Sequence, residues 1–312
     1  MDERALTPED FVRLAGTTPD AARRILDRHA PPALRYRELG IDERARIEAE
    51  VEDVIGNCSL RTVGGDDPRV WDEGWREVAD RLRGRSITIE SVRPQYFRGE
   101  PVCRLEGRYV RGLTDGFEYD VGLALRRLIF EEFLSEASTI VELGCGTGIN
   151  LLLMAEQFPQ ARLIGCDWAQ PSCDILDEMA RQTGRPIGAH IFNMLTASGW
   201  DGAEIDARTA VVTVHAMEQL GSRWQAFTDF LCRRGPALCL HIEPLVELYD
   251  ADSDFDECAC RYHRKRNYLA GFYPYIVGRA RKGEITLLAA RRVHFGGLYH
   301  EAYSILAWRP SR

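Results

Sequence analysis

The sequence Val141-Glu-Leu-Gly-Cys-Gly-Thr-Gly148 follows the apolar run 138–143 and precedes the apolar segment 149–156. The run predicts a buried strand, and the segment after it predicts a helix. Three glycines fall on the turn between them, where they permit a sharp bend and a close approach of a ligand to the main chain. The free N–H groups at the start of the following helix point toward the same place. The stretch therefore predicts a ligand site at a strand-to-helix turn.

The spacing of these glycines separates two classes of cofactor. Dinucleotide sites use Gly-x-Gly-x-x-Gly, whereas here the third glycine comes one residue earlier and Glu142 precedes the first by two positions. The form Glu-x-Gly-x-Gly-x-Gly resembles motif I of the class I (Rossmann-like) S-adenosylmethionine methyltransferases, of the bacterial small-molecule type. The resemblance implies that Glu142 accepts from the ammonium of S-adenosyl-L-methionine, directly or through water. It also implies cofactor contacts from Gly144, Cys145, Gly146 and Gly148.

Composition is that of a soluble globular protein. Of 312 residues, 45% are hydrophobic and 28% charged, and the net charge of −8 argues against a broad nucleic-acid-binding face. Nine cysteines occur without a Cys-x-x-Cys pair, so no metal site is expected. Neither a secretory signal nor a transmembrane run is visible. We expect a cytoplasmic protein with a small-molecule substrate, no membrane partner and a possible homodimer.

Residues 1–110 predict a mainly helical accessory or cap region. Thr7-Pro8 and Thr18-Pro19 are typical helix starts. Trp71 and Trp75 stand four residues apart on one helix face, which favours packing. The alternating segment 86–92 predicts a strand. Candidates for a lid over the cofactor, with ordinary packing as the favoured alternative, are Tyr96, Phe97, Tyr109 and Tyr119.

Residues 111–312 alternate between strand and helix patterns, which predicts a catalytic α/β domain with a mostly parallel sheet. The resemblance implies seven strands and a Rossmann-like arrangement that binds the cofactor. The last two strands have no helix between them, so they should form an antiparallel C-terminal hairpin. The expected strands are 140–143, 162–167, 187–192, 209–215, 237–242, 284–292 and 302–308.

Two further strand ends carry polar groups. Asp167 ends the second strand, where an acid accepts from ribose hydroxyls, and Trp168 beside it is suited to flank adenine. Asn193 ends the third strand, where the family usually has aspartate; its amide can still accept and donate. Met194 would add an apolar wall.

The substrate should lie beyond the fourth and fifth strands. Glu218 and Glu243 follow these strands, and His215 ends the fourth. We expect these three residues to be catalytic. Both acids would bind a cationic nitrogen, with helix-start polarity as the alternative for Glu218 and a core histidine as the alternative for His215. Expected substrate-binding residues are His241, Tyr299, His300 and Glu301.

These residues indicate N-methylation of a small cationic metabolite in specialised metabolism. The carboxy-terminal part is faintly similar to free-arginine N-methyltransferases of antibiotic pathways, which would make L-arginine a substrate. O-methylation with His215 or His300 as base remains open. A nicotinamide-dependent oxidoreductase, disfavoured by the glycine spacing, and an inactive cofactor-binding regulator also remain open.

Overall fold

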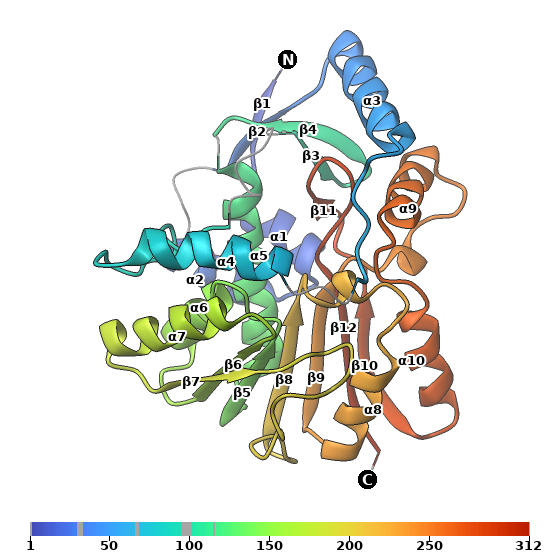
Figure 1. The fold of residues 1–312 in the computed structure, drawn as a ribbon. Coiled ribbons are helices and arrows are strands. Elements are labelled where there is room, and N and C mark those ends of the chain that lie inside the picture. The colour runs from blue at the N-terminus through green and yellow to red at the C-terminus, as the bar shows by residue number, and fades with distance from the viewer. Residues whose placement is uncertain (1, 30–33, 66–68, 95–101, 115, 312) are drawn as a thin grey trace.

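The computed structural model describes residues 2–311 apart from 30–33, 66–68, 95–101 and 115 (Figure 1). Its helices are α1 (Pro8–Ala15), α2 (Pro19–His29), α3 (Ile41–Gly56), α4 (Arg69–Leu82), α5 (Phe117–Leu134), α6 (Ile149–Gln157), α7 (Gln170–Thr183), α8 (Gln225–Arg234), α9 (Asp254–Arg266) and α10 (Phe272–Arg281), with 3-10 turns at Met217–Leu220 and Val246–Leu248.

A seven-stranded sheet forms the centre of the molecule. Five adjacent strands pair in parallel, in the order β7, β6, β5, β8 and β9. Strand β12 is antiparallel to both β9 and β10. This arrangement confirms the predicted Rossmann-like α/β class with an antiparallel C-terminal pair. In spatial order the strands are β10 (Ile285–Arg291), β12 (Ser304–Pro310), β9 (Leu238–Glu243), β8 (Thr209–Val214), β5 (Thr139–Leu143), β6 (Arg162–Asp167) and β7 (Ile187–Ile191).

A second, five-stranded sheet lies above the first in Figure 1 and was not predicted. Four of its strands come from the first 112 residues and one from the connection between β10 and β12, so the last two strands of the large sheet are not joined by a tight turn. In spatial order its strands are β1 (Glu3–Ala5), β2 (Arg35–Glu38), β4 (Arg108–Gly112), β3 (Val102–Leu105) and β11 (Phe295–Gly296).

The N-terminal helices are attached to the large sheet through α5. Thr7 and Asp10 form a reciprocal capping box at the start of α1, and buried Phe11 and Leu14 join the same hydrophobic cluster as Leu125 of α5. A boundary at residue 110 falls within β4. The division into an accessory region, 1–110, and a catalytic domain, 111–312, stays a prediction.

The predicted strand at 86–92 is wrong. Thr88 and Ser91 exchange two hydrogen bonds, in which the Thr88 N–H donates to Ser91 Oγ at 2.8 Å and the Ser91 N–H donates to Thr88 Oγ1 at 3.1 Å. These local bonds satisfy the backbone in a turn instead of a ladder. Short polar side chains therefore overrode the β-branched pattern.

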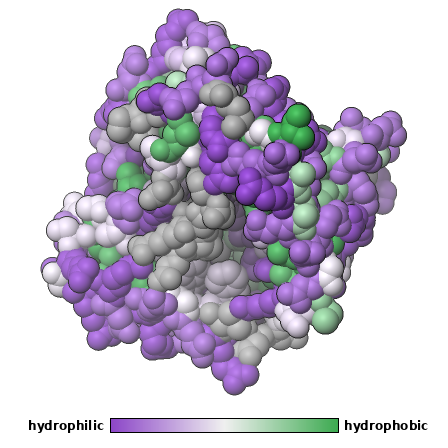
Figure 2. Space-filling model, turned by 90° about the horizontal axis from the view of Figure 1, so that it is seen from above, coloured by the Kyte–Doolittle hydropathy of each residue, from purple (hydrophilic) through white to green (hydrophobic). Residues whose placement is uncertain are grey.

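The two tyrosines that the structure describes are packed, as the favoured alternative predicted, and do not form a lid. The ring of Tyr109 packs edge-on against Phe255 at 4.9 Å, and the Tyr119 hydroxyl donates to the Ile89 carbonyl at 2.7 Å. Tyr96 and Phe97 lie outside the described residues. Among the described helices, none is both long and apolar enough to cross a bilayer. Figure 2 shows that the face seen from above is mostly hydrophilic.

Candidate functional site

Two adjoining cavities open at the carboxyl ends of the central strands. The Asp167 cavity contains Asp167, Trp168, Asn193 and Met194. The Glu218 cavity is lined by Arg126, Asn150, Glu218, Arg266 and His300, among others. Their common wall is made by Arg61, Val63, Trp71, Trp75, Gly144, His215 and Gln219.

The glycine turn after β5 lies between the two cavities. Gly144 lines both, and Gly146 lies under Trp75, whose ring atom Cζ2 would be 3.0 Å from a Cβ at that glycine. The Gly146 N–H donates to Asp167 Oδ2 at 2.9 Å. Cys145 lines the Glu218 cavity as a buried thiol. The turn therefore joins the end of β5 to the end of β6.

Gly148 is not a wall residue of either cavity, which corrects the expected cofactor contact. Its φ is +75°, and a Cβ there would lie 2.5 Å from Leu176 Cδ2 and 2.9 Å from Met179 Cε. Glycine at this position permits close packing of α6 against α7.

We expect Gly148→Ala to lower the free energy of unfolding by about 2–4 kcal/mol, because a clash with the core adds to backbone strain. The matched control is Gly184→Ala, where φ is +67° but nothing lies within 4 Å of the new Cβ. That variant should lose about 1 kcal/mol from strain alone. Urea unfolding measures both, and equal losses would contradict the packing role.

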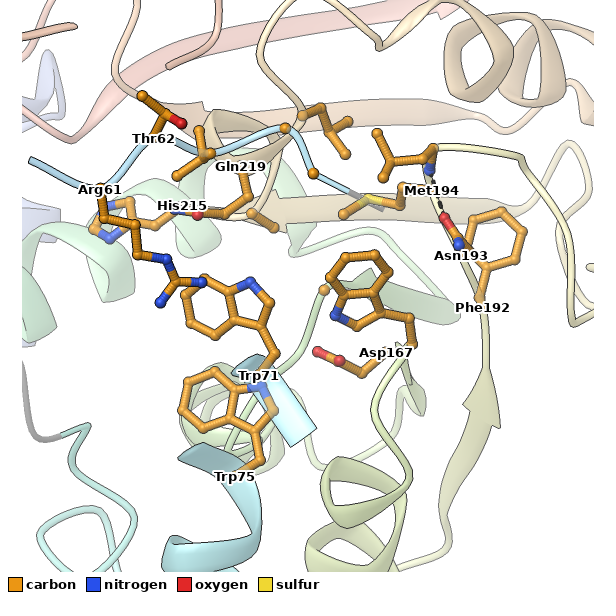
Figure 3. Close-up of a pocket in the computed structure, with 18 residues that line it drawn as sticks. Arg61, Thr62, Trp71, Trp75, Asp167, Phe192, Asn193, Met194, His215 and Gln219 are labelled. Carbon is orange, nitrogen blue, oxygen red and sulfur yellow. Dashed lines mark hydrogen bonds between the residues drawn. The ribbon is translucent and has the colours of Figure 1, made fainter. Parts of the chain in front are cut away.

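Asp167 is buried, and its carboxylate is held by the main chain. Besides Gly146, the Ala169 N–H donates to Oδ1 at 3.1 Å. Burial raises the pKa of Asp167 to about 6, against the lowering effect of these backbone hydrogen bonds. In Figure 3 its carboxylate points into the cavity from the end of β6, opposite Trp71 and Trp75.

Asn193 and Met194 line the same cavity after β7. The Leu195 N–H donates to Asn193 Oδ1 at 2.8 Å, as Figure 3 shows. The carbonyl oxygen of the amide is therefore engaged, and its Nδ2 remains as a donor.

A chain of hydrogen bonds connects Glu142 to the Glu218 cavity. Arg126 Nη1 donates to Asn150 Oδ1 at 2.9 Å, and Asn150 Nδ2 donates to Glu142 Oε1 at 2.6 Å. Arg126 Nη2 and Glu142 Oε2 are both buried and have no hydrogen-bond partner among the residues that the structure describes. Burial raises the pKa of Glu142 to about 8. One unsatisfied donor and one unsatisfied acceptor thus lie at the two ends of this chain.

The loop after β8 presents His215 and Glu218. His215 has a left-handed φ of +52°, a strained conformation for a residue with a side chain. Its Nε2 is buried without a partner, and burial lowers its pKa to about 3. Burial and the nearby Glu243 raise the pKa of Glu218 to about 8.

Glu243 does not face either cavity, so the expected pair of Glu218 and Glu243 is wrong. Its Oε1 accepts from the N–H groups of Ala216 at 3.1 Å and Met217 at 3.0 Å, and its Oε2 accepts from that of Glu218 at 3.2 Å. A buried carboxylate at a strand end takes the backbone donors of the adjacent turn. Glu243 thereby holds the loop that carries Glu218.

His241 is likewise a core residue and not a substrate contact. Its Nδ1 lies 2.9 Å from Thr213 Oγ1, and the Trp308 indole N–H donates to its Nε2 at 3.0 Å. Both ring nitrogens are engaged inside the sheet. The alternation along β9 turns this side chain away from the cavities.

Of the three consecutive residues expected near the last strand, only His300 lines a cavity. Tyr299 stacks on Tyr262 with ring centroids 4.7 Å apart. Glu301 is fully buried and accepts from Arg292 Nε at 2.6 Å. These two expectations are corrected, because aromatic packing and a buried ion pair occupy the side chains.

Sequence reasoning missed several cavity residues from the accessory region. Packing alone was expected for Trp71 and Trp75 of α4, but both line the two cavities, and Figure 3 shows their rings at the Asp167 cavity. The segment before α4 is fixed to the large domain, since the Val63 N–H donates to the Arg266 carbonyl and Asn267 Nδ2 to the Val63 carbonyl, at 2.9 and 2.8 Å. The sequence signal for this side of the site was the four-residue spacing that puts both tryptophans on one helix face.

Comparison with known proteins gives a family for the centre of the chain. Residues 140–233 match the family model described as a methyltransferase domain. A stretch of 44 residues is 46% identical to a trans-aconitate 2-methyltransferase from Azoarcus sp. (strain BH72), and covers 14% of this chain and 17% of that relative.

The fold is similar to that of a solved cyclase structure. The [4+2]-cyclase SpnF is 14% identical with a TM-score of 0.50, over 80% of this chain and 97% of that one. A geranyl diphosphate C-methyltransferase from Streptomyces coelicolor A3(2), solved with S-adenosyl-L-homocysteine, is 12% identical with a TM-score of 0.44, over 77% and 97% of the two chains.

Proposed function

We propose that this chain, which carries a class I S-adenosylmethionine-dependent methyltransferase domain, transfers a methyl group to a nitrogen atom of a small cationic substrate. When bound, S-adenosylmethionine supplies an electrophilic methyl group on a sulfonium. The protein must align the acceptor nitrogen and take its proton. The Glu218 cavity is the proposed site of the acceptor.

The unsatisfied polar atoms of the site fit the cofactor's amino-acid tail. Such a tail carries one carboxylate and one ammonium. Arg126 Nη2 is the unpaired donor for the carboxylate, and Glu142 Oε2 is the unpaired acceptor for the ammonium, directly or through water. A pyrophosphate would leave Glu142 facing negative charge, which is the physical argument against a nicotinamide cofactor.

The Asp167 cavity fits the adenosine part. Asp167 would accept from the ribose hydroxyls, and Asn193 would use its remaining Nδ2 donor toward the adenine ring. Trp168 and Met194 would supply apolar walls. Asp167→Ala should weaken binding of S-adenosylhomocysteine by about 1–3 kcal/mol in calorimetry, because ligand hydroxyls lose their acceptor.

Trp75 provides a separate test of the accessory region. Trp75→Ala should weaken binding of S-adenosylhomocysteine by about 1–2 kcal/mol, because the indole covers the glycine turn and removes apolar surface from water. Trp75→Phe should lose less. Unchanged binding in both variants would show that α4 serves packing alone.

The observation that carries the nitrogen proposal is a pair of carboxylates in the Glu218 cavity. Glu118, in the first turn of α5, and Glu218 both line it, and neither forms an ion pair with any residue that the structure describes. Burial raises the pKa of Glu118 to about 7. The charges of Arg93 and Arg266 offset the rise of these two pKa values only in part. A cationic substrate would supply a paired counter-charge, and an acid with a pKa near neutral is suited to accept its proton.

O-methylation remains the second candidate, because His215 Nε2 is buried in this site without a partner. A pKa of about 3 makes His215 a weak base. The deciding experiment measures S-adenosylhomocysteine release across amines, guanidines and hydroxyl compounds. Turnover of hydroxyl compounds alone would end the nitrogen proposal. Binding of NADH without binding of S-adenosylhomocysteine would end the methyltransferase proposal.

A further inference from the structure

The wall of the Glu218 cavity formed by residues 266–268 and His300 carries positive charge. Arg266 lies over the Tyr268 ring, with its guanidinium carbon 5.0 Å from the ring centroid. Its Nε is buried without a partner. Within the described chain the side chain forms no hydrogen bond and no ion pair. An unpaired guanidinium at a cavity wall is suited to bind an anionic oxygen group.

His300 stacks on Tyr268 at 5.6 Å and makes a hydrogen bond with His263, in which His263 Nε2 lies 2.6 Å from His300 Nδ1. Burial and the neighbouring arginines lower the pKa of His300 to about 3, and burial lowers that of His263. Both rings are therefore neutral at neutral pH, and one proton lies between them.

The direction of this hydrogen bond follows from the second nitrogen of His263. His263 Nδ1 is buried without a partner. If His263 accepted the proton from His300, its Nδ1 would carry an N–H with no acceptor, which is rarer and costlier than an unused acceptor. His263 therefore donates, and His300, which lines the cavity, carries its own proton on its second ring nitrogen, Nε2.

This arrangement gives the cavity a donor wall and an acid wall. Arg266 and the His300 Nε2–H are donors, while Glu118 and Glu218 are carboxylates. The titratable and charged groups near His300 in the described chain are His263, Arg104, Arg266, His215, Tyr262 and Tyr268. Arg266 is near enough to Glu218 for its charge to lower the pKa of that acid, but among the described residues no carboxylate forms a salt bridge with the Arg266 side chain.

We infer that Arg266 and His300 form a carboxylate subsite, and that the substrate is an amino acid whose carboxylate binds there while its side-chain nitrogen faces Glu218. The inference deepens the proposed function and depends on it for the identity of the methylated atom. Arg266 then determines specificity, and His263 is a positioning residue that fixes the His300 tautomer.

The test compares amino acids with their decarboxylated amines on the full chain. The pairs are L-arginine with agmatine, L-lysine with cadaverine, and L-ornithine with putrescine. With S-adenosylmethionine present, kcat/KM for the carboxylated member of a substrate pair should be at least tenfold higher. Arg266→Gln should reduce that ratio to near one, mainly by raising KM for the amino acid. Arg266→Lys should give an intermediate ratio.

The matched control is Arg264→Gln, since Arg264 is exposed and pairs with Glu257 on the same helix. It should leave the ratio unchanged. Equal use of both members of a pair would overturn the carboxylate subsite while leaving nitrogen methylation intact. Ester formation on the carboxylate would also overturn it.

A binding measurement decides the question even without turnover. Calorimetry with the protein–S-adenosylhomocysteine complex should show that one or more carboxylated members bind at least tenfold more tightly than their amines, and that Arg266→Gln removes the difference. Absence of that difference for all pairs would overturn the inference. Nitrogen-15 NMR should find the His300 proton on Nε2; a proton on Nδ1 would contradict the donor role.

Discussion

Glu218→Gln is expected to lower kcat by about 10²- to 10⁴-fold, because the amide cannot accept the proton of the attacking nitrogen. Glutamine keeps the oxygen that accepts from Gln219 Nε2 at 2.8 Å, so the loop should stay in place. Affinity for S-adenosylhomocysteine should change little, since the proposed cofactor contacts are with Arg126, Glu142 and the Asp167 cavity and not with Glu218. Methyl transfer is measured by release of S-adenosylhomocysteine, and cofactor affinity by calorimetry.

The comparison variants are His215→Ala and Glu136→Gln. His215→Ala should reduce kcat less than Glu218→Gln does. Glu136 is exposed and lines neither cavity, so its amide variant should match the parent protein. A larger loss for His215→Ala would favour hydroxyl methylation with a histidine base and would contradict the role of Glu218.

Affinity for S-adenosylhomocysteine is expected to rise by nearly tenfold per pH unit between about pH 6.5 and 7.5. Without ligand, burial raises the pKa of Glu142 to about 8, partly offset by Asn150 and Arg126. A ligand ammonium favours the ionised form, so binding lowers this pKa and releases a proton. Each pH unit below the pKa of Glu142 in the ligand-free protein therefore costs about 1.4 kcal/mol of binding free energy. The increase in affinity ends near pH 8.

Calorimetry in two buffers of different ionisation enthalpy should count about one released proton at pH 7. Glu142→Gln removes the titrating group and should flatten the profile. The pH range of this measurement lies above the pKa of Asp167, which is about 6, so Asp167 is mostly ionised throughout. A pH-independent affinity without proton release would contradict contact between Glu142 and the ligand ammonium.

Glu142 also makes the folding stability depend on pH, but stability falls with rising pH where ligand affinity increases. An acid whose pKa is raised in the folded state binds its proton more tightly there than in the unfolded chain. Glu142 therefore lowers the stability of the ligand-free protein as pH rises from its unfolded value toward 8. The proposed ammonium contact would remove this loss when ligand is bound.

Local sequence patterns were sufficient to place the residues proposed to bind the cofactor. The glycine turn, Asp167 and Asn193 could be placed because each follows a short apolar strand, and the carboxyl ends of parallel strands meet at one edge. The alternation of strand and helix patterns along the chain likewise predicted the large sheet. Its strands could be recognised because burial on both faces requires continuous apolar runs. Short-range order was sufficient for these features.

Only the tertiary structure shows which side chains near the proposed substrate site face the cavities. Glu243 and His241 have the right position in sequence, yet backbone N–H groups and core side chains engage them. Trp75, Arg126 and Arg266 come from three distant segments and line the Glu218 cavity. Such contacts depend on how helices and loops pack across the sheet edge, and no spacing within one segment encodes them.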